Sequence, residues 1–227
     1  MKTIYFDELK RELLSIKALI ITVILIGTAF IAGKYSTTLD LISSDGGSSP
    51  LIDILFGIYG FFGLMFSFLI FSGIVARDVD SQSMRYITPY LSRTKIFFAK
   101  YFSMLTYFVL ILFLSLVILF LTRGEIIFPV QSLVNITLFF SYSEALVLFF
   151  SVLFNKERMV SLTGMIISIA FPILGAWSTI SSNYILKIIS WVLPYRYVDA
   201  KLDIIILVFL TVLILLFGLF IFLRKEI

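Results

Sequence analysis

The sequence contains no cysteine and no histidine, and only 14% of its 227 residues are charged. The missing residue types exclude disulfide frameworks, Cys/His zinc sites, thiol nucleophiles and histidine general bases. The low charge excludes a water-soluble globular domain, because so few polar side chains cannot cover a surface of this size. The net charge of +4 is too small to indicate a nucleic-acid partner.

Apolar residues make up 60% of the chain, and the mean hydropathy is +1.09. Six continuous apolar runs are long enough to cross roughly 30 Å of hydrocarbon as helices, and they lack the alternation of barrel strands. The composition therefore predicts an all-α integral membrane protein with one six-span domain over residues 1–227. The predicted spans are residues 18–33, 54–76, 101–121, 133–154, 159–177 and 204–223.

Lysine and arginine are distributed unevenly around these spans. The N-terminal segment, the loop after the second span, the turn at 155–158 and the C-terminus together hold thirteen of the eighteen basic residues. Because basic residues stay on the cytoplasmic side, both termini and loop 77–100 are predicted to be cytoplasmic in a multi-pass protein of the cell membrane. A cleaved signal peptide is an alternative for the first run, disfavoured because five more spans follow.

Residues 1–17 differ in kind from the spans. Phe6, Leu9, Leu13 and Ile16 fall on one helical face, and the charged residues fall mainly elsewhere. This pattern predicts an amphipathic helix at the inner leaflet. A cytosolic extension of the first span is the other interpretation.

Loop 77–100 reads RDVDSQSMRYITPYLSRTKIFFAK and holds five of the basic residues. Its middle part is too apolar for a solvated linker, which predicts either an exposed docking surface or a loop folded back on the inner leaflet. A helix is predicted to restart at Ser92, with Lys95 and Lys100 reaching lipid head groups. The apolar residues of the predicted docking surface are Met84, Tyr86, Ile87, Tyr90 and Leu91.

The order of these features and the residues of the loop resemble the membrane subunit of type-2 ATP-binding-cassette exporters. Gln82 and Ser83 stand where this family usually has Gly-Thr, and Pro89 lies one or two positions before its usual place. The resemblance implies an elbow helix within 1–17 and a coupling helix within 77–100. The residues that carry it are Asp78, Asp80, Tyr90, Leu91, Ser92, Arg93, Thr94, Lys95, Ala99 and Lys100.

The resemblance further implies that ATP and Mg bind a separate cytoplasmic subunit. This chain is then not itself an enzyme and is expected to bind no cofactor or metal. A second permease copy or a related permease is expected to complete the path through the lipid. The nearest phosphate-loop phrase, GTAFIAGKY, has five intervening residues and ends in tyrosine, so it does not fit GxxxxGK[ST]. The expected cargo is an amphipathic or hydrophobic peptide, antibiotic or lipid. The residues expected to contact the ATPase are Asp78, Asp80, Ser83, Met84, Arg85, Tyr86, Ile87, Tyr90, Leu91, Ser92 and Arg93.

Four further residues are candidates for the pathway or its gates. Glu144 lies near the middle of a span, where a charge costs about 2.5–3.5 kcal/mol, so it is either a pathway carboxylate or a neutral interhelix contact. Gly57 and Gly60, with Gly63, either allow close helix approach or leave room for substrate. Trp191 lies in the outer segment 178–203, whose phrase YILKIISWVLP is too short to cross and predicts a re-entrant or interfacial helix.

Two other function classes compete with an exporter. A membrane-embedded enzyme is disfavoured, because the polar residues do not converge on paired carboxylates and no His/Cys cluster exists. A non-transporting anchor or sensor subunit, or an unrelated six-span carrier, remains the alternative to an exporter.

Overall fold

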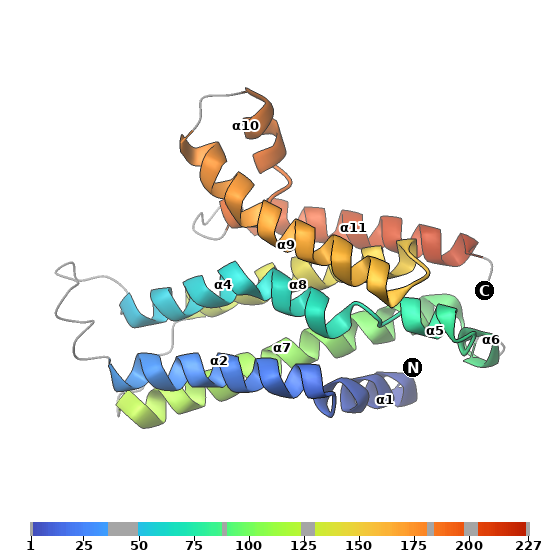
Figure 1. Cartoon of the computed structure of the whole chain (residues 1–227), viewed down its shortest axis with the longest axis horizontal. Coiled ribbons are helices and arrows are strands. Elements are labelled where there is room, and N and C mark those ends of the chain that lie inside the picture. Colours follow the sequence, from blue (N-terminus) through green and yellow to red (C-terminus); the bar gives the residue numbers. More distant parts are fainter. Residues whose placement is uncertain are drawn as a thin grey trace.

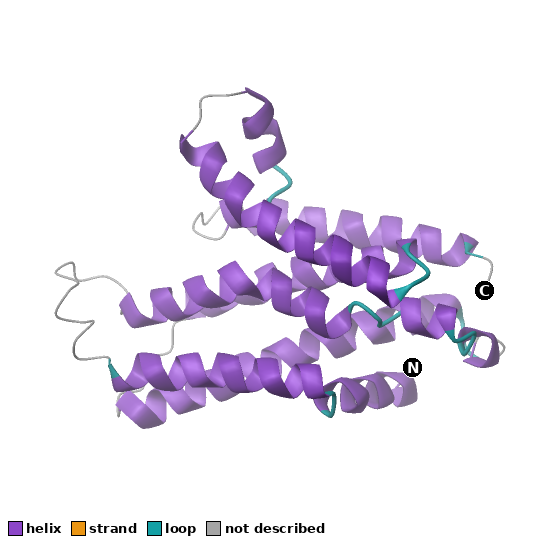
Figure 2. Cartoon of the chain, in the orientation of Figure 1, coloured by secondary structure: helices purple, strands orange, loops and turns teal. Residues whose placement is uncertain are grey.

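A computed structural model describes residues 2–35, 50–87, 90–123, 130–180, 184–197 and 204–225. Within these ranges the chain is helical and contains no strand (Figure 2). The predicted all-α class is therefore confirmed.

Six helices are long and apolar enough to cross a membrane, which confirms the predicted number of spans in the described ranges. Helix α7 is longer than its predicted span, because its first two turns carry basic residues that lower the local hydropathy. Helix α4 is followed by a turn and then by a short helix, so this span extends to Asp80. The six are α2 (Ile16–Lys34), α4 (Pro50–Phe71), α7 (Arg93–Arg123), α8 (Val130–Leu153), α9 (Glu157–Ile180) and α11 (Ile204–Arg224).

Five short helices lie near the ends of the long ones. The two ends of the chain lie close to α5 and α6, and α10 lies at the far end of α9 (Figure 1). We call the end with both termini the terminal end, and the end with α10 the distal end. The short helices are α1 (Lys2–Leu13), α5 (Ala76–Asp80), α6 (Met84–Ile87), α10 (Tyr184–Ser190) and the 3-10 helix η1 (Pro194–Tyr197).

The core is aromatic and lies between α4, α7 and α8. Phe108 stacks on Phe140 with ring centroids 4.2 Å apart, and Phe71 meets Phe108 edge-on. Such pairs add to the burial of large apolar surfaces. Helix α2 packs along α7 and α11 along α8, whereas much of α9 and α11 remains exposed.

The glycines of α4 serve close packing at one position only. A Cβ at Gly63 would lie 2.9 Å from a ring carbon of Phe140, so this glycine lets α8 approach. A Cβ at Gly57 or Gly60 would meet nothing within 4 Å. The prediction that these two glycines allow close helix approach is therefore wrong for contacts within the chain. The reason is geometric, because each step of three residues turns the position by about 60° around the helix.

Candidate functional site

A buried lysine organises the terminal end of the bundle. The side chain of Lys100 on α7 is 1% exposed, and its ammonium group donates to Asp78 Oδ2 at 2.5 Å and to the Ile74 carbonyl at 2.6 Å. Its third donor bonds the Glu8 carboxylate. The prediction that Lys100 reaches lipid head groups is therefore wrong, because two carboxylates and a carbonyl hold its ammonium group inside the protein.

Helix α1 contributes the other charges of this cluster. Arg11 pairs with Glu8, and its guanidinium nitrogen lies 3.6 Å from Asp78 Oδ1. Glu12 is buried beside them, and this burial raises its pKa to about 7, although Arg11 partly opposes the effect. The cluster of Glu8, Arg11, Glu12, Asp78 and Lys100, which we call the ionic junction, thus joins α1, α5 and α7.

A second and more exposed set of ion pairs lies next to the junction. Glu157, the first residue of α9, accepts from Lys17 at 3.1 Å and from Arg77 Nε at 3.3 Å. Lys17 belongs to α2 and Arg77 to α5. Helix α5 is therefore linked by charge to the starts of the first and fifth spans, although exposed pairs of this kind contribute only about 0–1 kcal/mol each.

The turn between α4 and α5 is held by a serine from α8. The backbone amides of Val75 and Ala76 both donate to Ser151 Oγ at 3.0 Å, and the Ser151 hydroxyl donates to the Ser72 carbonyl at 3.1 Å. These amides begin α5 and have no partner within their own helix. Ser151 thereby holds the turn that separates α4 from α5.

The C-terminal helix closes the same end. Arg93 at the start of α7 donates to the carbonyls of Lys225 at 2.7 Å and Leu223 at 3.1 Å. Lys225 in turn donates to the Val152 carbonyl at the end of α8. The terminal end is thus connected by polar contacts across α1, α2, α5, α7, α8, α9 and α11.

The residues of loop 77–100 are divided between the inside and the surface. Met84 is fully buried, so the prediction that it belongs to an exposed docking surface is wrong. Its side chain belongs to the cluster of buried apolar residues that forms the core. Asp78 is also buried, in the ionic junction, and Ser83 is half-buried with its hydroxyl donating to the Asp78 carbonyl at 3.2 Å.

The remaining loop residues offer a smaller exposed surface than expected. Tyr90 is 86% exposed, and Leu91 packs against the core while Arg93 is half-buried. The side chains of Tyr86 and Ile87 lie outside the described part of the structure, as do residues 88–89. Of the residues expected to contact the ATPase, those with exposed side chains in the described part are Asp80, Arg85, Tyr90 and Ser92.

Gln82 has a backbone conformation that glycine adopts most readily. Its φ is 56°, in the left-handed region. This conformation turns the chain between α5 and α6, and the neighbouring Ser81 and Ser83 hydroxyls bond each other at 3.1 Å. It is the position at which the resembling family usually has glycine.

The pathway candidates Glu144 and Trp191 lie in different parts of the molecule. Glu144 is fully buried on α8. The Ser67 hydroxyl of α4 lies near its carboxyl group, but neither carboxylate oxygen makes a hydrogen bond to a described residue. Trp191 lies at the distal end and is 52% exposed. The structure therefore does not bring the two candidates into one site.

Comparisons with protein-family models and with curated proteins found no match to this chain. The assignment of a function consequently depends on the residues themselves.

Proposed function

We propose that this chain is the membrane subunit of a type-2 ATP-driven exporter, and that a separate cytoplasmic chain hydrolyses ATP. The observation that carries the proposal is the attachment of α5, the short helix in the connection between α4 and α7. Asp78 links it to Lys100 and Arg11, and Arg77 links it to Glu157. Because separating buried charges is costly, a force on this connection would move α1 and α7 with it.

The exposure of α1 supports its role as an elbow helix at the membrane surface. Phe6 is 61% and Leu13 38% exposed on the outside of the molecule, whereas Glu8 and Glu12 are buried against the bundle. Asp7 and Lys10 are exposed as well, so the outer side of α1 carries both apolar and charged residues, while Leu9 packs against the core. The arrangement suits a helix whose outer face contacts lipid.

The proposed coupling region consists of α5, α6 and the exposed residues that follow. Arg85 and Tyr90 would contact the ATP-binding subunit, while Asp78 and Lys100 would transmit its movement inward. The left-handed backbone at Gln82 agrees with the glycine that the family usually places there. ATP and Mg would be bound by the partner, and a second permease copy would complete the path for an amphipathic or hydrophobic cargo.

The test is purification in mild detergent after crosslinking in the source membranes, followed by mass spectrometry. A stoichiometric chain with a phosphate-binding loop is expected with the wild type and should be strongly reduced with Tyr90→Ala. Tyr184→Ala is the matched control, because Tyr184 is 82% exposed at the distal end. Recovery of the crosslinked chain without any ATP-binding partner would overturn the proposal.

Glu144 favours a second candidate, a six-span carrier driven by an ion gradient. A fully buried carboxylate without a cation partner among the described residues is a feature of proton and ion pathways in membranes. Transport into vesicles that needs a proton gradient but no ATP, and that is lost in Glu144→Gln, would support the carrier. ATP-dependent transport that persists in Glu144→Gln would exclude it.

A further inference from the structure

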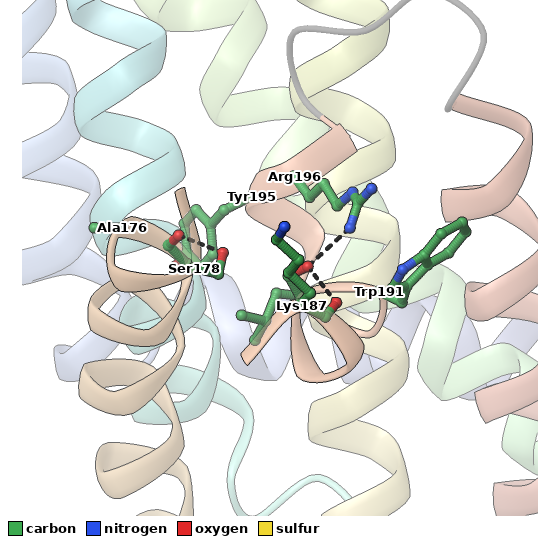
Figure 3. A pocket seen from close by; sticks show the side chains of 9 residues that line it. Ala176, Ser178, Lys187, Trp191, Tyr195 and Arg196 are labelled. Carbon is green, nitrogen blue, oxygen red and sulfur yellow. Dashed lines mark hydrogen bonds between the residues drawn. The ribbon is translucent and has the colours of Figure 1, made fainter. Parts of the chain in front are cut away.

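A cavity of about 670 Å³ lies at the distal end, between α9, α10 and η1. Its described lining includes two cations, Lys187 and Arg196, and no acidic residue. Figure 3 shows both cationic side chains extending to the same side of α10, with Trp191 beside them. The cavity is far from the ionic junction and takes no part in the proposed coupling.

The guanidinium group of Arg196 is held in place before any ligand binds. One of its nitrogens donates to Ser190 Oγ at 2.8 Å, and its central carbon lies 4.6 Å from the centre of the Trp191 ring (Figure 3). Ser190 is itself oriented by its bond to the Lys187 carbonyl at 2.7 Å. Since guanidinium has five N–H donors in a fixed plane, several remain for an anion.

A second cation of the cavity has no described partner. Lys187 is exposed and forms no ion pair with the residues that the structure describes. Tyr195 also lines the cavity, but its hydroxyl is buried within the wall and makes no hydrogen bond to a described residue. The cationic donors that the described lining offers to an anion are therefore those of Lys187 and Arg196.

We propose that this cavity binds the phosphate group of an anionic phospholipid. Arg196 and Lys187 supply donors to the phosphate oxygens, which suits the geometry of a phosphodiester. The same helices expose a large apolar surface, with Ile180 86% and Ile188 66% exposed, on which acyl chains can lie. A free phosphate ion would use the donors but leave this apolar surface uncovered.

Fluorescence quenching tests the proposal directly, because the chain has two tryptophans. In a Trp177→Phe background, Trp191 reports on the cavity alone. The protein is reconstituted in phosphatidylcholine vesicles that contain a minor fraction of either brominated phosphatidylglycerol or brominated phosphatidylcholine. The quenching constant for brominated phosphatidylglycerol should be well above that for brominated phosphatidylcholine. Lys187→Gln and Arg196→Gln should each lower the ratio of the first constant to the second about fivefold.

Matched controls come from the terminal end of the molecule, opposite the cavity. Lys156→Gln and Arg158→Gln remove one lysine and one arginine that are exposed at the terminal end, and they should leave the ratio unchanged. Lys187→Gln removes no described contact, so a loss of preference there cannot be attributed to misfolding. Equal quenching by the two lipids would overturn the site. A change of Trp191 emission with inorganic phosphate in detergent, without any lipid preference in vesicles, would overturn the lipid source.

Discussion

Lys100 neutralises two carboxylates that are largely buried, so its removal should be more damaging than the loss of an ordinary surface cation. Lys100→Met leaves Glu8 and Asp78 buried with less positive charge, and the expected loss is about 3–5 kcal/mol of stability. Thermal denaturation in detergent measures it. Lys95→Met on the exposed side of the same helix is the control and should have little effect.

The same cluster allows a sharper comparison. Lys100→Met combined with Asp78→Asn removes one cation and one anion together, and Glu8 keeps its pair with Arg11. Because the remaining charges are again balanced, most of the lost stability should return. If the double variant is no more stable than Lys100→Met, the charge balance is not what stabilises the junction.

Glu12 should make the stability of the junction depend on pH. Its pKa is about 7 in the folded protein, against an ordinary value of 4.5, chiefly because the residue is buried. The folded state therefore binds the Glu12 proton more tightly than the unfolded state does. The contribution of Glu12 to stability is complete below pH 4.5 and is lost as the pH rises through 7. The expected loss is at most about 3 kcal/mol.

Melting curves between pH 5 and pH 8 test this dependence. Glu12→Gln should flatten the decline of stability with pH, since the amide does not ionise. Asp7→Asn is the control, because Asp7 is exposed on the same helix and its substitution should leave the decline in place. A wild-type melting temperature that rises over this range would contradict the prediction.

Among the helices, α5 depends on a side chain from another span. Ser151→Ala removes the acceptor of the Val75 and Ala76 amides and leaves them buried without a partner. The expected loss is about 1–3 kcal/mol, with faster hydrogen exchange in the peptide that covers residues 72–80. Ser103→Ala is the control, because that hydroxyl bonds only the Lys100 carbonyl of its own helix. Unchanged hydrogen exchange in Ser151→Ala would show that α5 is stable without the hydrogen bonds to Ser151.

The helices could be predicted from the sequence because lipid demands long apolar segments, and this demand is local. The site could not be predicted in the same way. Lys100 and Glu8 are 92 residues apart, and hydropathy treats each of them as a residue that should be exposed. A signal was present in the phrase FFAKYF, where Lys100 lies between aromatic residues in the interior of a helix. Its partners could be identified only from the packing of α1 on α7.

For the protein as a whole, the distribution of basic residues predicts which end faces the cytoplasm. The polar contacts described above gather at the terminal end, and this end also holds most of the lysine and arginine. Since the chain has no cysteine, a single introduced cysteine can report on each end. Tyr90 and Tyr184 suit this purpose, because they are 86% and 82% exposed at opposite ends.

A membrane-impermeant maleimide applied to intact cells should label Tyr184→Cys and should label Tyr90→Cys only after permeabilisation. The reason is that basic flanks are retained inside during insertion, which places Tyr90 in the cytoplasm and Tyr184 outside. Equal labelling of both variants in permeabilised cells shows that each cysteine is reachable. Labelling of Tyr90→Cys in intact cells, with Tyr184→Cys protected, would reverse the orientation and remove the loop from reach of a cytoplasmic ATPase. The exporter proposal would then fail, whereas the charge balance of the ionic junction would be unaffected, because it depends only on contacts within the chain.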